Sequence, residues 1–98
     1  MEYEIEYKPE AEADLSEILL YLARFYPGTP KRFDEAFQQK IDMLRFNPHT
    51  AHYEYNPMFR KVIVKGYLVF FTIDEGAGIV TIHHVRCGRR RPFENDGT

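Results

Sequence analysis

Residues 59–73 read FRKVIVKGYLVFFTI, and this stretch decides the fold. It is dense in β-branched and aromatic side chains, which suit a pleated and largely buried surface. The stretch is interrupted once, at Lys65-Gly66, where glycine accepts the positive φ that a tight hairpin turn requires. A second turn, DEGAG at 74–78, leads into another β-rich run, IVTIHHV at 79–85. The sequence therefore predicts three antiparallel strands joined as a meander.

The residues before this sheet predict one further strand and two helices. Residues 2–8 alternate strictly between charged and apolar side chains, which is typical of a half-buried strand at a sheet edge. Pro9 opens the first helix, which Pro27-Gly28 ends. Thr29 is the expected N-cap of the second helix, which Asn47-Pro48 ends. The apolar stripes that these helices should bury are Ala11, Leu15, Ile18, Leu19 and Leu22, then Phe33, Ala36, Phe37, Ile41 and Leu44.

The element order β-α-α-β-β-β predicts an α+β fold. We expect an antiparallel sheet with the N-terminal helix hairpin packed on one face, which leaves the opposite face at least partly open to a partner. Residues 47–57 show no sustained period and are expected to form a surface loop. A chain of 98 residues is long enough for one domain, expected over residues 1–93, with a polar tail over residues 94–98.

Composition excludes several classes of protein. The apolar content of 44% is too high for a disordered chain. No run approaches the ~18 consecutive apolar residues that a membrane span needs, and the acidic start is not a signal peptide. The chain holds one cysteine, so it cannot form an internal disulfide. These features predict a protein of the reducing cytoplasm that has no membrane partner.

Charge is divided unevenly along the chain. The formal net charge is -2, yet residues 1–50 hold ten acidic and six basic side chains, whereas residues 51–98 hold five acidic and seven basic ones. Positive charge therefore gathers on the sheet half of the chain. This asymmetry indicates an anionic partner for one face only.

Four stretches, taken in order, resemble the toxins of the RelE/ParE superfamily from bacterial type II toxin–antitoxin modules. They are YKPEAEADL at 7–15, LRFNP at 44–48, FRKVIVKGYLVFF at 59–71 and VRCGRR at 85–90. Each stretch alone is a loose pattern, but together they cover nearly the whole chain. The resemblance implies a toxin that arrests growth and a cognate antitoxin protein as partner. We expect no cofactor and no metal.

That superfamily has two branches with different activities. The resemblance implies either ribosome-dependent cleavage of mRNA, which is the RelE-like activity of a metal-independent endoribonuclease, or inhibition of DNA gyrase without catalysis, which is the ParE-like activity. We expect the first, with the ribosome and mRNA as targets, and keep the gyrase inhibitor as the alternative. A degenerate toxin that serves only as antitoxin partner or co-repressor is a third alternative.

The expected site follows from the chemistry of RNA cleavage without a metal. Such cleavage needs a base for the attacking 2′-OH, cations for the phosphate and an acid for the leaving 5′-oxygen. Arginine suits the phosphate because its planar fork donates two hydrogen bonds, and histidine titrates near neutral pH. By resemblance, Arg60 and Arg90 stand where RelE-like toxins carry phosphate-binding arginines. The expected catalytic residues are Arg60, Arg90 and His84, and the expected phosphate contacts are Lys61, Arg86, Arg89 and Arg91.

Each of these residues also has a structural explanation. Arg60 could be a solvated arginine at a strand edge or could pair with a helix carboxylate, and the arginine run could bind an acidic antitoxin segment. His83 and His84 are adjacent in a strand, so their side chains should point to opposite faces. We expect His84 to share the face of Val80 and Ile82, and the pair to form no metal site.

Some residues weaken the nuclease interpretation. RelE-like enzymes end with a tyrosine near the cut site, where this chain has Phe93, and Tyr67 is its last tyrosine. Tyr53 or Tyr55 could stack on a base, or could fill the small core of the loop. His49 and His52 lack an accompanying set of carboxylates or thiolates, so no metal site is predicted there. Cys87 is interpreted as a free cysteine at a strand end, with a reactive thiol as the alternative.

Overall fold

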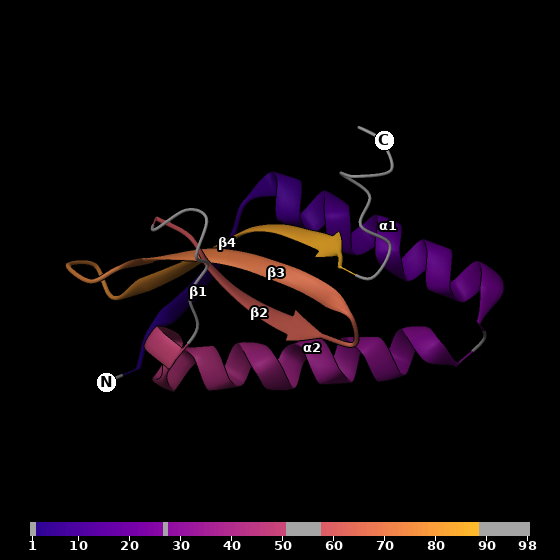
Figure 1. Ribbon diagram of the computed structural model, residues 1–98, viewed down its shortest axis with the longest axis horizontal. Coiled ribbons are helices and arrows are strands. Elements are labelled where there is room, and N and C mark those ends of the chain that lie inside the picture. Colours follow the sequence, from indigo (N-terminus) through magenta and orange to yellow (C-terminus); the bar gives the residue numbers. More distant parts are fainter. Residues whose placement is uncertain (1, 27, 51–57, 89–98) are drawn as a thin grey trace.

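The computed structural model describes residues 2–26, 28–50 and 58–88. The chain forms β1 (Glu4–Tyr7), α1 (Pro9–Phe25), α2 (Thr29–Phe46), a short 3₁₀ helix η1 (Pro48–Thr50), β2 (Arg60–Val64), β3 (Tyr67–Asp74) and β4 (Ile79–Cys87) (Figure 1). This order confirms the predicted β-α-α-β-β-β fold. No helix in the described part of the chain is long and apolar enough to cross a membrane.

The four strands form one sheet in the order β1-β4-β3-β2, so β1 and β2 are its edges. The β2–β3 and β3–β4 pairs are antiparallel, as predicted for the meander. The β1–β4 pair is parallel, with Glu4 opposite Ile79 and Tyr7 opposite Ile82, so the sheet is mixed. β1 can pair with β4 in the parallel sense because the helix hairpin, β2 and β3 lie between them in the chain. Parallel strands need such a long connection and cannot be joined by a tight turn.

The core lies between the helix hairpin and one face of the sheet. Both predicted stripes are confirmed, since their side chains are buried or packed against the buried cluster. The sheet contributes buried side chains at alternate positions of its strands, and this alternation is broken once, in β4. These residues are Val64, Val69, Phe71, Val80, Ile82 and Val85. Tyr3, just before β1, is buried, while Glu4 and Glu6 within β1 are exposed, which confirms the predicted edge strand.

Glycines shape two of the tight places in this fold. The β2–β3 turn has φ 52° at Lys65 and φ 86° at Gly66, the pair of positive φ values expected of a two-residue type I′ hairpin. The start of α2 differs from the prediction. Gly28 is the N-cap at φ 88°, and Thr29 is already helical. The left-handed backbone of Gly28 therefore lets α2 begin one residue earlier than it would with Thr29 as the N-cap.

The end of β4 packs closely against the β2–β3 turn. The Gly88 N–H donates to the Gly66 carbonyl at 2.9 Å. A Cβ atom on Gly88 would lie 3.0 Å from Leu68 Cγ and 3.2 Å from the Gly66 oxygen, so only glycine fits without a shift. This contact brings the turn and the end of β4 together at the same end of the molecule as the α1–α2 connection.

Candidate functional site

A β-bulge changes the orientation of the two adjacent histidines. Phe71 lies opposite Ile82, but Phe70 lies opposite His84, so His83 is an extra residue in β4. Opposed residues of an antiparallel pair share a face. His84 therefore lies on the face of Phe70, opposite the face that packs on the buried core, and the prediction that it shares the face of Val80 and Ile82 is wrong. The strict alternation on which that prediction depended fails because the bulge inserts one residue.

His83 turns toward the same open face. Its Nε2 atom is 2.9 Å from Thr72 Oγ1, and its ring meets the ring of Phe59 edge to face, with centroids 5.0 Å apart. Burial lowers the pKa of His83, and the positive charges of Lys8 and His84 lower it further. The neutral imidazole is therefore favoured near neutral pH. Both histidines thus face the open side of the sheet, contrary to the prediction that at most one would.

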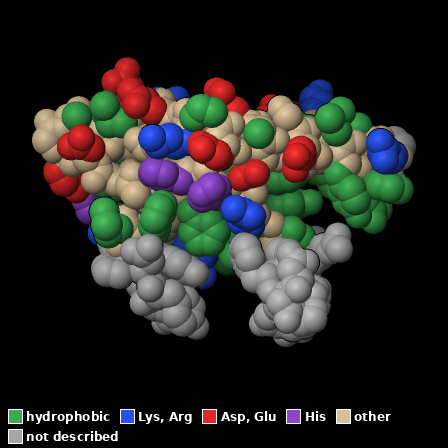
Figure 2. Space-filling model, turned by 90° about the horizontal axis from the view of Figure 1, so that it is seen from above, with side chains coloured by type: hydrophobic (Ala, Val, Ile, Leu, Met, Phe, Trp, Pro, Cys, Tyr) green, Lys and Arg blue, Asp and Glu red, His purple; other side chains and the backbone are tan. Residues whose placement is uncertain are grey.

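His84 lies beside a carboxylate from α1. Its Nδ1 atom is 3.8 Å from Asp14 Oδ2, and the same oxygen accepts a hydrogen bond from the Val85 N–H at 3.0 Å. β1 pairs with β4 only as far as Ile82. Beyond that point β1 offers no acceptor to the backbone of β4, and Asp14 supplies one for the Val85 N–H. Figure 2 shows histidine side chains side by side near the middle of the view, with acidic and basic side chains around them. The sequence carried no signal for Asp14, because the contact joins residues that are 71 positions apart.

Lys61 and Arg86 lie on the same open face as His84. Lys61 is opposite Phe70, which is itself opposite His84, so the three side chains form one row across the sheet. Arg86 lies opposite Leu68 in the neighbouring row, and both basic residues are half-buried. The structure therefore places two of the predicted phosphate contacts on one surface with the histidine pair.

Arg60 lies on the other face. It is opposite Phe71, which is fully buried against the helices. Its Nη1 atom donates to the His49 carbonyl at 3.2 Å, which links β2 to η1. The structure thus separates Arg60 from His84, although both were predicted to act in one catalytic site.

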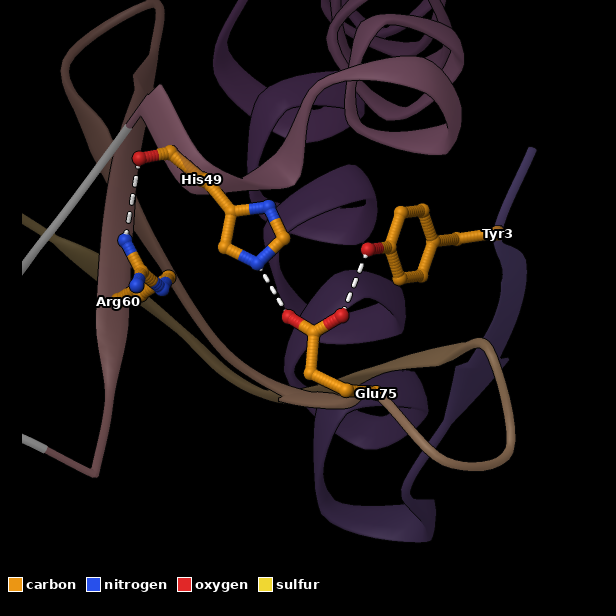
Figure 3. A network of polar contacts seen from close by, with 4 residues as sticks. All are labelled: Tyr3, His49, Arg60 and Glu75. Atoms are coloured by element: carbon orange, nitrogen blue, oxygen red, sulfur yellow. Dashed lines mark hydrogen bonds and ion pairs between the residues drawn. The ribbon is translucent and has the colours of Figure 1, made fainter. Parts of the chain in front are cut away.

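Arg60 belongs to a network of polar contacts built around Glu75 (Figure 3). The Tyr3 hydroxyl donates to Glu75 Oε1 at 2.8 Å, and His49 Nε2 contacts Glu75 Oε2. The Tyr3 and His49 rings also meet edge to face, with centroids 6.0 Å apart. The network therefore joins the residue before β1, η1, β2 and the β3–β4 turn, four segments that are distant in sequence.

Hydrogen bonds from Tyr3 and His49 lower the pKa of Glu75, and the charges of His49 and Arg60 contribute in the same direction. The same contact with Glu75 raises the pKa of the Tyr3 hydroxyl. Glu75 is therefore held as a carboxylate at neutral pH. The charge of Arg60 therefore acts on a carboxylate of the β3–β4 turn.

Several predicted site residues lie outside the described residues: Arg89, Arg90, Arg91, His52, Tyr53, Tyr55 and Phe93. Cys87 is half-buried at the end of β4, opposite Tyr67. Within residues 2–26, 28–50 and 58–88, no group of three or more His, Cys, Asp or Glu side chains could hold a metal ion. His49 does meet the carboxylate of Glu75.

Comparison with known proteins defines the class to which this fold and sequence belong. The family described as the ParE toxin of the type II toxin–antitoxin system parDE matches residues 5–92, so the chain belongs to this family of toxins. The resemblance to the RelE/ParE superfamily is thereby confirmed. No curated protein sequence matches the chain.

Solved structures share the fold at low sequence identity. The chromosomal ParDE system from P. aeruginosa superposes with a TM-score of 0.73 at 13% identity, over 87% of this chain and 95% of that one. A mutant of the E. coli toxin RelE in the free state gives 0.68 at 12% identity, over 97% and 93%. A RelE mutant in complex with an antitoxin RelBc peptide gives 0.69 at 14% identity, over 100% and 96%. At such identities the likeness concerns the fold alone, and it is shared by toxins named ParE and RelE.

Proposed function

We propose that this chain is a toxin that arrests growth by binding DNA gyrase, without a catalytic step, and that a cognate antitoxin neutralises it. Gyrase inhibition is the activity of the ParE-like branch, and the family match over residues 5–92 is to the ParE toxin. Antitoxin binding is supported by the solved relatives, one of which is a RelE mutant in complex with an antitoxin peptide.

The position of Arg60 carries this proposal. An RNA-cleaving site without a metal needs a phosphate-binding cation and an acid–base group on one surface, within reach of the same phosphate. Here Arg60 lies on the helix-covered face and bonds the His49 carbonyl, whereas His84 lies on the opposite face. The chain also lacks a tyrosine after Tyr67. Both features favour a binding protein over a nuclease.

A second candidate function, ribosome-dependent mRNA cleavage, is favoured by the bulge. The bulge puts two imidazoles on the face that also holds Lys61 and Arg86, so proton-transfer groups and cations share one surface. In this candidate, His83 and His84 would move protons, Lys61 and Arg86 would bind phosphate, and Arg90 would keep its expected role. Arg60 would then act only by holding the fold.

One experiment separates the two candidates. The chain is induced briefly without its antitoxin, message is mapped by primer extension, and the purified chain is added to a gyrase supercoiling assay. Growth arrest with intact message and inhibited supercoiling is the expected result. New 5′ ends confined to translated messages, and lost in His84→Ala, would establish the nuclease instead. Unimpaired growth would contradict both candidates and leave the degenerate toxin.

A further inference from the structure

A hollow of about 550 Å³ opens at the end of the molecule where α1 meets α2. Its volume falls within the range of about 300–1,000 Å³ that is usual for ligand pockets. Four aromatic side chains line it, from both helices and from β3: Tyr21, Tyr26, Phe33 and Tyr67. The β2–β3 turn and the end of β4 close it with Lys65 and Cys87.

The aromatic lining continues onto the outer surface. Tyr21, Phe25 and Tyr26, here called the aromatic shelf, are 45%, 54% and 52% exposed. Their rings are in mutual contact, with centroids 4.9 Å apart for Tyr21 and Phe25 and 6.5 Å apart for the other two pairs. Three exposed rings in contact form an apolar patch of the kind that marks an interaction site. Aromatic side chains of this kind also supply much of the binding energy of protein interfaces.

The charge around the hollow is positive. Arg32 and Lys65 are the charged residues that line it, within the part of the chain that the structure describes. Arg24 adds a third cation beside the shelf, with its guanidinium carbon 6.0 Å from the centroid of the Phe25 ring. This positive charge is local, because residues 1–50 as a whole carry an excess of acidic side chains.

We propose that the hollow and the aromatic shelf dock a segment of the cognate antitoxin. The segment places an aromatic or large aliphatic side chain in the hollow and acidic side chains next to Arg32 and Lys65. This inference rests on the proposed function insofar as the chain has an antitoxin as partner. The complementary charges orient the segment, and burial of the shelf supplies the apolar contact.

The test measures the affinity of the purified antitoxin for variants of the full chain. Tyr26→Ala removes one wall of the hollow, and Lys65→Glu reverses the charge at its rim. Each should raise Kd about tenfold or more, the effect expected for a residue at the centre of an interface. Lys65→Glu should lower the association rate most strongly at low salt, because the pair of opposite charges steers the encounter.

Matched controls come from the same helix hairpin. Phe46→Ala removes an aromatic ring that is 65% exposed at the other end of α2, and Lys31→Glu makes the same charge change beside Arg32 at a position that does not line the hollow. Each should change Kd by no more than about threefold. Equal Kd values for the wild-type chain, Tyr26→Ala and Lys65→Glu would overturn the proposal. So would loss of self-association of the free chain in Tyr26→Ala with antitoxin affinity unchanged, since that result would make the occupant a second copy.

Cys87 gives a second measurement that needs no substitution. It lines the hollow, it is half-buried, and it is the single cysteine of the chain. Its rate of alkylation by iodoacetamide, followed by mass spectrometry of the peptide that contains it, should fall about tenfold or more in the complex, because a docked segment excludes the reagent. An unchanged rate would overturn the proposal even if the variants failed to fold.

Failure of this inference can be told apart from failure of the proposed function. Tyr26→Ala and Lys65→Glu should remain toxic without antitoxin but should escape its protection in a growth assay. A wild-type chain that does not arrest growth would contradict the proposed function, while the Kd values and the protection of Cys87 would still decide the docking site.

Discussion

At the scale of single residues, Asp14 connects α1 to β4 through its carboxylate. One oxygen accepts the Val85 N–H and lies beside His84. Asp14→Ala leaves that partly buried amide without its acceptor, and should destabilise the fold by about 1–3 kcal/mol. Urea unfolding of the variant measures this loss. Glu17→Ala, at an exposed position of the same helix, is the control and should change stability by less than about 0.5 kcal/mol.

Glu75 makes stability depend on pH. Its pKa is lowered in the folded chain, so the folded state binds fewer protons than the unfolded state as the pH falls through the carboxyl range. The stabilisation is present above the unfolded pKa and is lost as the pH falls through the folded pKa. The Tm of the wild-type chain should therefore exceed that of Glu75→Gln at pH 7, and the difference should shrink steadily below about pH 4. If the difference in Tm between the two chains were the same at every acidic pH measured, the charge of the Glu75 carboxylate would not contribute to stability.

At the scale of elements, the close approach of the β2–β3 turn and the end of β4 depends on Gly88. Gly88→Ala would put Cβ 3.0 Å from Leu68 Cγ and 3.2 Å from a backbone oxygen, so it should cost about 1–3 kcal/mol. Gly76→Ala is the matched control, because its Cβ would meet only Asp74 Oδ1 at 3.7 Å. Thermal unfolding of the two variants compares them, and equal Tm values would contradict this account.

The elements themselves could be predicted because their signals are local. Alternation in residues 2–8, the stripe from Ala11 to Leu22 and the Lys65-Gly66 turn each depend on neighbours within a few positions, and all three are confirmed. The bulge at His83 could not be predicted, because no glycine or proline marks it and the register of β3 fixes it. The Asp14–Val85 and Tyr3–Glu75 hydrogen bonds were missed for a similar reason, since each joins residues more than seventy positions apart.

At the scale of the whole molecule, substitutions on the open face of the sheet should reduce toxicity, whereas substitution of Arg60 on the helix side should reduce stability. Lys61 and Arg86 lie on the open face, whereas Arg60 lies on the helix side and bonds the His49 carbonyl. Lys61→Glu combined with Arg86→Glu should weaken the toxicity of the folded chain at least about tenfold, because charge reversal on a binding face repels an anionic target. Arg60→Gln should lower Tm and leave the folded fraction toxic. Induction titrations and thermal unfolding measure the two effects, and a loss of toxicity confined to Arg60→Gln would reverse this assignment.

The pairing of β1 with β4 also determines the point during synthesis at which the sheet can be completed. β1 leaves the ribosome before either helix, but its partner strand emerges only after the helix hairpin, β2 and β3. The Tyr3–Glu75 contact likewise spans 72 positions. Since chains are made at about 5–20 residues per second, this sheet stays open for some seconds while translation continues. A nascent chain therefore cannot complete this sheet until β4 has been added, and products truncated before β4 lack one of its two inner strands.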